Sequence, residues 1–287
     1  MESDRQGSEA VAEATEMATT ERERRVYPTD LTDAQWELVE VLIPPAISGG
    51  RPRSTNIREV LNALFYGERA GGGWRMLPHD FPPWETVYRY FRKWKLDGTW
   101  QRIHDILRGT VREMADRSDE PTAGIIDSQS AKTAEKGGER GYDAGKKIHG
   151  RKRHLLVDVM GLVLAVMVHS AGIQDRDGAR PVLEEAAKAC PQLKHVWADG
   201  AYSGSLIDEA KSELGITVEI VKRPPDAIGF EVQPRRWVVE RTFGWLGKYR
   251  RHSKDYETLT DSSKAHIHLA MTHLMLRRLA PDPDGFV

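Results

Sequence analysis

The second half of the chain alternates strand-like and helix-like segments, and this order limits the available folds more than any other feature. Short apolar runs read AGIID, HVWAD and ITVEIV, and RHLLVDV and LVLAVMVHS are separated by Met160 and Gly161 as in a hairpin. Helical periodicity fits DGARPVLEEAAKA, SLIDEAKSEL and the segments that follow the last strand. The resulting order predicts an α/β domain with a mixed sheet and flanking helices.

The first half has a different pattern, in which helical segments follow one another. Helices fit AQWELVEVLIP, which ends at Pro44 and Pro45, and the ranges 57–66, 82–98 and 100–115. Residues 1–25 are acidic and poor in apolar groups, which predicts a disordered tail. With a boundary at the polar run DRSDEPT, we expect a small all-α domain at 26–118 and the α/β domain at 119–287.

One helix of the all-α region has an apolar face and a basic face. Its apolar side chains include Trp84 and Phe91, and the opposite face carries Arg89, Arg92 and Lys93. A short turn followed by a basic helix is typical of the second helix of a helix-turn-helix, which enters the major groove of DNA. The alternative is a core helix with solvated cations.

Charge is distributed unevenly along the chain, although the formal net charge is only −1. Residues 128–154 contain eight lysines and arginines against three acids, and residues 221–257 contain nine against five. Two basic segments predict a polyanionic partner. In the first segment the cations surround a glycine-rich loop that could follow a DNA backbone, or could simply be solvated: Lys132, Lys136, Arg140, Lys146, Lys147, Arg151, Lys152 and Arg153.

Other features exclude several classes of protein. Cys190 is the only cysteine, so we expect no disulfide framework and no cysteine zinc site, and we place Cys190 in the core. The acidic N-terminus and the short apolar run LVLAVMV predict a cytoplasmic protein without a membrane span. The run GERAGGGWR lacks the phosphate-binding pattern of a nucleotide triphosphatase. His266, His268 and His273 lack a clear metal-ligand spacing and are expected on a helix surface.

The segment Arg235–Glu257 places a single acid within a basic helix. At about 100° per residue, four positions fall within about 40° of Glu240: Arg236, Gly244, Gly247 and Arg251. The opposite side is apolar and can pack on a core. Glycine costs a helix about 1 kcal/mol relative to alanine, so the two glycines predict the close approach of something bulky. The alternative is a surface helix with ordinary ion pairs from Glu240 to Arg236 and Lys248.

Two further acids each follow a short apolar segment. Asp127 closes IID and Asp199 closes VWAD, and we expect both at the carboxyl ends of neighbouring strands, where ligands bind in α/β sheets. Two adjacent carboxylates repel each other unless a cation lies between them, and oxygen ligands favour Mg²⁺ or Mn²⁺. A third acid would complete a pair of metal positions. For either aspartate alone, a turn at the end of a strand is the alternative.

Long blocks of the sequence resemble a known family. These are IIDSQSAKTAEKGGERGYDAGKKIHGRKRHLLVDVMGLVLAVMVHSAGIQDRDGA, WADGAYSG and RRWVVERTFGWLGKYRRHSKDYE. They resemble the catalytic core of bacterial insertion-sequence transposases of the DDE class, in insertion sequence family five of the IS4-type superfamily. The earlier blocks YPTDLTDAQWELVEVLIPP and FPPWETVYRYFRKW resemble the helical domain that precedes this core. The resemblance covers roughly residues 27–279.

The resemblance implies a ribonuclease-H-like catalytic domain at 119–287, with Asp127, Asp199 and Glu240 as three acids that hold two Mg²⁺ or Mn²⁺ ions. Arg236 matches the arginine of the family's glutamate motif. Elsewhere the chain departs from the pattern of the wider superfamily, because Gln233 replaces a tyrosine and Gly247 replaces a lysine. Lys248 or Arg251 is expected to supply the missing cation.

The resemblance also implies an activity. A transposase of this kind cleaves the ends of its element and joins the freed 3′-hydroxyls to target DNA. Its partners would be double-stranded DNA carrying terminal inverted repeats, the target DNA and a second copy of the chain, since two ends must be brought together. No nucleotide cofactor is expected. A catalytically inactive DNA-binding descendant and a stand-alone nuclease remain open at this point.

Overall fold

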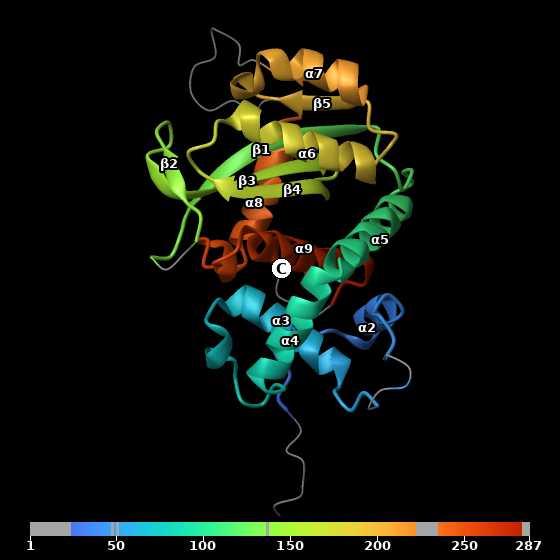
Figure 1. Cartoon of the computed structure of the whole chain (residues 1–287). Helices are drawn as coiled ribbons and strands as arrows, with labels where there is room; N and C mark the ends of the chain where they lie inside the picture. The colour runs from blue at the N-terminus through green and yellow to red at the C-terminus, as the bar shows by residue number, and fades with distance from the viewer. Residues whose placement is uncertain (1–23, 47–48, 50–51, 136–137, 222–234, 283–287) are drawn as a thin grey trace, which may run out of the picture.

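Figure 1 shows a computed structural model of the chain, which describes residues 24–46, 49, 52–135, 138–221 and 235–282. The predictions for tail residues 1–23, for Lys136 and for Gln233 lie outside the described residues. Within these ranges no helix combines the length and the apolar character needed to cross a bilayer.

A six-stranded sheet forms the centre of the second half of the chain. Its strands, in chain order, are β1 (Ala123–Lys132), β2 (Gly141–Asp143), β3 (Ile148–Asp158), β4 (Val163–Ser170), β5 (His195–Ala198) and β6 (Thr217–Ile220). The order across the sheet is β2-β3-β1-β5-β6, and β4 also pairs with β3. The pairs β1–β3, β2–β3 and β3–β4 are antiparallel, whereas β1–β5 and β5–β6 are parallel. The prediction of a mixed sheet is therefore confirmed.

Helices cover both faces of this sheet, and the alternation of side chains along the strands decides which face each residue meets. Ile126 and Leu156 belong to a core with α6 (Asp175–Ala189) and α7 (Ser205–Leu214). Ile125 and Leu155 point to the other face, against α8 (Trp237–Gly247) and α9 (Thr260–Leu279). In Figure 1, α6 lies in front of the sheet and α7 at its upper edge, while α8 and α9 lie behind and below. Cys190 is fully buried in the first core, as predicted.

The N-terminal region is entirely helical within residues 24–118. It contains α2 (Asp33–Glu40), α3 (Ile57–Ala70), a short 3₁₀ helix η1 (Trp74–Met76), α4 (Trp84–Leu96) and α5 (Thr99–Met114). These helices share their core with α9, which contributes Leu269 and Met275. The connection from α3 to α4 covers residues 71–83, far longer than the turn of three or four residues in a helix-turn-helix. The helix-turn-helix prediction is thus not confirmed, although the predicted helices are present.

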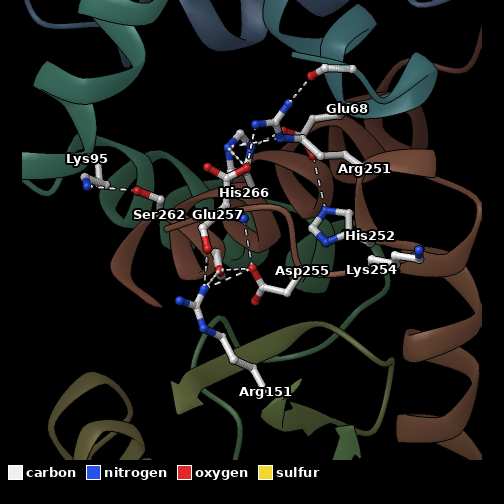
Figure 2. A network of polar contacts seen from close by, with 12 residues as sticks. Glu68, Lys95, Arg151, Arg251, His252, Lys254, Asp255, Glu257, Ser262 and His266 are labelled. Atoms are coloured by element: carbon white, nitrogen blue, oxygen red, sulfur yellow. Dashed lines mark hydrogen bonds and ion pairs between the residues drawn. The ribbon is translucent and has the colours of Figure 1, made fainter. Parts of the chain in front are cut away.

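A buried ionic network joins the N-terminal helices to the end of the chain (Figure 2). Glu68 of α3 is 1% exposed and pairs with His266 of α9 and with His252, at an N–O distance of 3.2 Å for His252. Burial by itself would raise the pKa of the Glu68 carboxyl, but His266 and His252 hold that pKa well below its usual range. The prediction that His266, His268 and His273 lie on the surface is wrong, because all three are buried.

We predict that Glu68→Gln lowers the free energy of unfolding by roughly 3–5 kcal/mol at neutral pH, because it removes the buried carboxylate that pairs with both His266 and His252 and leaves His266 only its longer contact with Glu257, at 3.4 Å. The depressed pKa of Glu68 means that its stabilisation is complete above the unfolded-state pKa of the carboxyl and is lost as the pH falls through the folded-state value. Urea unfolding of both proteins between pH 3 and 8 should therefore give a difference that shrinks below about pH 4.5.

The exposed Glu113 of α5 provides the control, because Glu113→Gln should change stability by less than about 0.5 kcal/mol. A Glu68→Gln protein as stable as the parent at pH 7 would contradict the structural role of this network.

The turn between β3 and β4 fixes the position of α8. Gly161 adopts a φ of +83°, and a Cβ atom placed there would lie 2.7 Å from the Trp245 ring and 2.8 Å from Thr242 Oγ1. Thr242 donates a hydrogen bond to the Gly161 carbonyl at 2.9 Å, and Arg241 donates one to the Met160 carbonyl, also at 2.9 Å. This contact explains why the hairpin needs glycine at position 161.

We expect Gly161→Ala to destabilise the protein by about 1–3 kcal/mol, because the added methyl group clashes with α8 and the left-handed backbone strains any other residue. Gly244→Ala is the matched control, since an added Cβ there meets open space in an exposed helix. That variant should be more stable than the parent by roughly 0.5–1 kcal/mol. Thermal unfolding of both variants would show whether the two changes have opposite signs.

Candidate active site

The parallel pairing of β1 with β5 brings Asp127 and Asp199 together. Ile125 lies opposite Trp197 in the register, so the two acids, each two residues further along, occupy corresponding positions on the same face. Neighbouring strands are about 4.8 Å apart, which sets the separation of the two backbones. The prediction differs from the structure in one respect, because β1 continues for five residues beyond Asp127. Asp199 also accepts a hydrogen bond from the Ala201 amide at 2.8 Å and caps the short helix η2 (Gly200–Tyr202).

Asp127 is the more perturbed of the two acids. Burial, and to a smaller extent the negative charge of Asp199, raises the pKa of its carboxyl to about 6. The amide of Ser128, at 2.7 Å from Asp127 Oδ1, and the cations Arg236 and Lys146 act in the opposite direction. The carboxyl of Asp127 therefore ionises less readily than that of an ordinary aspartate.

Helix α8 adds the third acid on the same side of the sheet. Arg236, the residue before the helix, lies 3.6 Å from Asp199 Oδ2 and 3.8 Å from Glu240 Oε1. The Glu240 side chain is 50% exposed. The ion pair between Arg236 and Glu240 is therefore present, and the same guanidinium also reaches Asp199, while the catalytic role of these residues stays a prediction.

The three acids fit a hard divalent cation in chemistry, because all their donors are carboxylate oxygens and Asp127 carries excess negative charge. Within the described residues, however, no three acidic, histidine or cysteine side chains lie close enough to hold a metal ion together. Arg236 accounts for this arrangement, because it lies between Asp199 and Glu240.

Helix α8 ends at Gly247, which overturns the prediction that Arg251 shares a helical face with Glu240. Arg251 turns inward and is 9% exposed. Its guanidinium pairs with Glu257 and donates a hydrogen bond of 2.9 Å to the Gly72 carbonyl. Arg251 is buried and all its guanidinium nitrogens are engaged, so we no longer assign it as a DNA contact. Lys248 follows the helix directly and is exposed, so the proposal for a cation beyond Glu240 now rests on Lys248.

Three cations of the first basic segment are also no longer assigned as DNA contacts, because they lie inside β3 and not in a loop. Arg151 is 0% exposed and donates to Asp255 and to the carbonyls of Glu257 and Thr258. Lys152 is buried on the opposite face of the strand, 2.9 Å from Asp175. Arg153 is buried as well, and it donates to the carbonyls of His252 and Lys254, at and just after the end of the short 3₁₀ helix η3 (Arg250–His252).

The other predicted cations remain at the surface. All are exposed: Lys146, Lys147, Lys248, Arg89, Arg92 and Lys93. Lys146 also donates a hydrogen bond of 2.9 Å to the Ser128 carbonyl, which ties the β2–β3 turn to the strand that carries Asp127. The contact of these six exposed cations with DNA stays a prediction.

A polar network behind Asp127 had not been predicted. Ser128 Oγ donates to Asp175 Oδ1 at 2.8 Å, and Lys152 Nζ lies 2.9 Å from the same oxygen. These contacts fix β1 from the α6 face immediately beside Asp127. The sequence feature that could have indicated this network is Asp175 at the start of a helix. Its partners, however, are identified only by the antiparallel register of β1 and β3.

Tryptophan and arginine side chains also stack beside the acids. Arg241 lies 4.5 Å from the centre of the Trp237 ring and 4.6 Å from that of Trp245, and Arg235 lies 4.0 Å from that of Trp197. Trp237, three residues before Glu240, is 41% exposed. The two Arg241 stacks lie within α8, whereas the Arg235–Trp197 stack joins the residues before α8 to β5.

The sequence matches two family models. One is described as "Transposase DDE domain" and matches residues 118–275, and the other is described as "Putative transposase of IS4/5 family" and matches residues 31–104. The first model covers more than half of the chain and includes all three acids. The chain therefore belongs to the bacterial DDE transposases of the IS4 type.

Individual relatives agree with this assignment. The chain is 29% identical over 127 residues to the "Putative transposase for insertion sequence element IS402" of Burkholderia cepacia, which is 42% of this chain and 60% of that protein. It is 38% identical over 64 residues to the "Uncharacterized protein y4sN" of Sinorhizobium fredii, 22% of this chain and 51% of that protein. The chain thus spans about half to three fifths of the length of these two relatives.

We predict that Asp127→Asn stabilises the metal-free protein at pH 8 by about 1–3 kcal/mol, because the asparagine removes a buried charge. The folded-state pKa of about 6 lies above the ordinary value of 3.8, so folded protein binds more protons than unfolded protein between these values. The stability of the parent should therefore fall as the pH rises through this window, while that of Asp127→Asn should not.

Urea unfolding in the presence of EDTA would measure this difference. Glu37→Gln, at an exposed position of α2, is the control and should show no such dependence. Equal stability of Asp127→Asn and the parent from pH 4 to 8 would show that the Asp127 carboxyl is not perturbed.

Proposed function

We propose that this chain is a DNA transposase that cleaves the ends of its own element and joins the 3′-hydroxyls to target DNA by two-metal-ion phosphoryl transfer. Asp127, Asp199 and Glu240 hold two Mg²⁺ or Mn²⁺ ions in this proposal. The observation that carries it is the β1–β5 register, because it places two carboxylates side by side on the sheet face that α8 supplies with a third. The family membership supports the same assignment.

In the proposed reaction the three acids are metal ligands, and Arg236 is a hydrogen-bond donor to the phosphate. Bound divalent ions would activate water or a 3′-hydroxyl and neutralise charge on the phosphoryl oxygens. Asp127, whose pKa of about 6 lies below neutral pH, is available as a carboxylate ligand under ordinary conditions. Arg236 lies at 3.6 Å and 3.8 Å from two of the acids, so neutralisation of those acids frees its guanidinium to donate to a phosphate oxygen.

The DNA path follows from the exposed cations. Lys248 extends the site beyond the C-terminal end of α8, and Gly244 and Gly247 leave open space on the exposed side of that helix. Lys146 and Lys147 lie at the β2–β3 turn, and Arg89, Arg92 and Lys93 lie on the outer face of α4. Binding through such phosphate contacts should weaken steeply with salt. A dimer or higher assembly on DNA follows from the need to bring two element ends together.

The experiment uses linear DNA that carries the inverted repeats flanking the gene, with Mg²⁺ and a target plasmid. We predict that the parent protein nicks and joins these ends, and that Asp127→Asn, Asp199→Asn and Glu240→Gln each lower the rate by at least about 10³-fold, since loss of any ligand disrupts both metal positions. Glu219→Gln, an acid on the neighbouring strand β6, is the control and should retain activity.

Equal product yields from the parent and Asp127→Asn would overturn the proposal. Salt-sensitive DNA binding without cleavage by the parent would instead indicate a catalytically inactive, transposase-derived DNA-binding protein.

A further inference from the structure

The backbone ladder that brings the two aspartates of the candidate site together ends before it reaches them. Strands β1 and β5 pair over Ala123–Ile125 and His195–Trp197, and Asp127 and Asp199 each lie two residues further along. Asp199 also lies beyond the last residue of β5, which is Ala198. A contact other than this ladder is therefore needed to fix the separation of the two carboxylates.

The side chain of Tyr202 makes such a contact. Tyr202 is the last residue of η2, the short helix that Asp199 caps, and it is fully buried in the core shared with α6. Its hydroxyl is hydrogen-bonded to Nδ1 of His154 on β3, at 3.3 Å. The same hydroxyl interacts with the side chain of Ser128, which lies opposite His154 in the register and directly follows Asp127. Because β1 lies between β3 and β5, this side chain ties the segment after β5 to both other strands.

The ring of His154 is a rigid anchor for this contact. It is fully buried, and α6 packs so closely on it at Gly178 that a Cβ atom there would lie 2.7 Å from His154 Nε2. Burial, and to a smaller extent the neighbouring His169, lowers the pKa of His154 to about 3, so the ring is neutral at physiological pH. Within the described residues Nε2 has no hydrogen-bond partner, and the Tyr202 hydroxyl supplies the hydrogen bond of the ring at Nδ1.

The Tyr202 hydroxyl also lies near the charges of the candidate site. Burial, and to a smaller extent the negative charges of Asp127, Asp175 and Asp199, raises the pKa of Tyr202 well above its usual range. The phenol therefore keeps its proton and acts as a hydrogen-bonding group. It reaches the acids from the α6 side of the sheet, whereas Asp127 projects to the opposite side, since neighbouring residues of a strand alternate between faces.

We propose that Tyr202 is a positioning residue of the candidate active site, which holds η2 against β1 and β3 and thereby sets the distance between Asp127 and Asp199. The inference rests on the proposed function, in which these two carboxylates hold divalent cations together. Without the hydroxyl both acids remain, but the segment that carries Asp199 loses its attachment to the strand that carries Asp127. Metal ligands that are less firmly oriented bind their ion more weakly.

The test measures Mn²⁺ binding to the protein without DNA, from the electron paramagnetic resonance signal of free Mn²⁺, so that no turnover is involved. Tyr202→Phe removes the hydroxyl and keeps the ring. We expect its dissociation constant for Mn²⁺ to rise about tenfold, as is usual when a group that orients metal ligands is lost. DNA cleavage by this variant should need correspondingly more Mn²⁺ and should approach the parent rate when Mn²⁺ is saturating.

Tyr249→Phe is the matched control. Tyr249 is also buried, and its hydroxyl lies 3.3 Å from Nδ1 of a buried histidine, His273. The charged groups that act on Tyr249 are Arg69, Glu68 and Arg277, and none of the three acids is among them. Both substitutions should lower the urea midpoint of unfolding to a similar extent, but Tyr249→Phe should bind Mn²⁺ like the parent.

A second variant, His154→Leu, removes the partner of the hydroxyl and leaves the tyrosine in place. It should weaken Mn²⁺ binding by the same factor as Tyr202→Phe. The double variant should bind Mn²⁺ no more weakly than either single variant, because both substitutions remove the same contact.

Mn²⁺ binding by Tyr202→Phe and His154→Leu that equals that of the parent would overturn the positioning role and leave the proposed function intact. An equal weakening in Tyr249→Phe would have the same meaning, since it would reflect a general loss of stability. Mn²⁺ binding by the parent that Asp127→Asn leaves unchanged would show that the acids hold no metal ion, and would overturn the proposed function as well.

Discussion

The parallel pairing of β1 with β5 is the interaction on which the candidate site depends. Asp127 and Asp199 are separated in the sequence by strands β2, β3 and β4 and by helix α6, and only this register makes them neighbours. The same pairing assigns Ile125 and Trp197 to the face on which α8 packs. One set of backbone hydrogen bonds therefore defines both the pair of acids and the apolar surface that holds the helix carrying the third.

Buried charges connect the helical region to the sheet region. Glu68 meets His266 and His252, Arg151 meets Asp255, and each of these groups is desolvated. A buried ion that lost its partner would be strongly destabilising, so these pairs fix how α3, α9 and the segment after α8 meet. Because Arg251 joins the same network, the segment after α8 is positioned by ionic contacts as well as by packing.

Local pattern predicted the strands, the helices and the mixed sheet, because periodicity reflects which side chains must be buried. It failed where burial depended on distant partners. The basic run that includes Arg151 and Lys152 looked like a solvated loop, yet alternation in β3 sends these two residues to opposite faces, where Asp255 and Asp175 neutralise them. The helix at Glu240 was extended too far for a similar reason, since nothing local shows that Arg251 leaves the helical path to meet Glu257.

Arg236 reduces the repulsion among the acids of the candidate site. Its guanidinium lies 3.6 Å from Asp199 and 3.8 Å from Glu240, distances beyond those of strong charge-assisted hydrogen bonds. It therefore reduces repulsion without being locked to either acid, and it leaves the charge of Asp127 only partly compensated, as the raised pKa of that carboxyl shows. In the proposed reaction, divalent cations would displace this loosely held arginine from the acids, and its guanidinium would then donate to a phosphate oxygen.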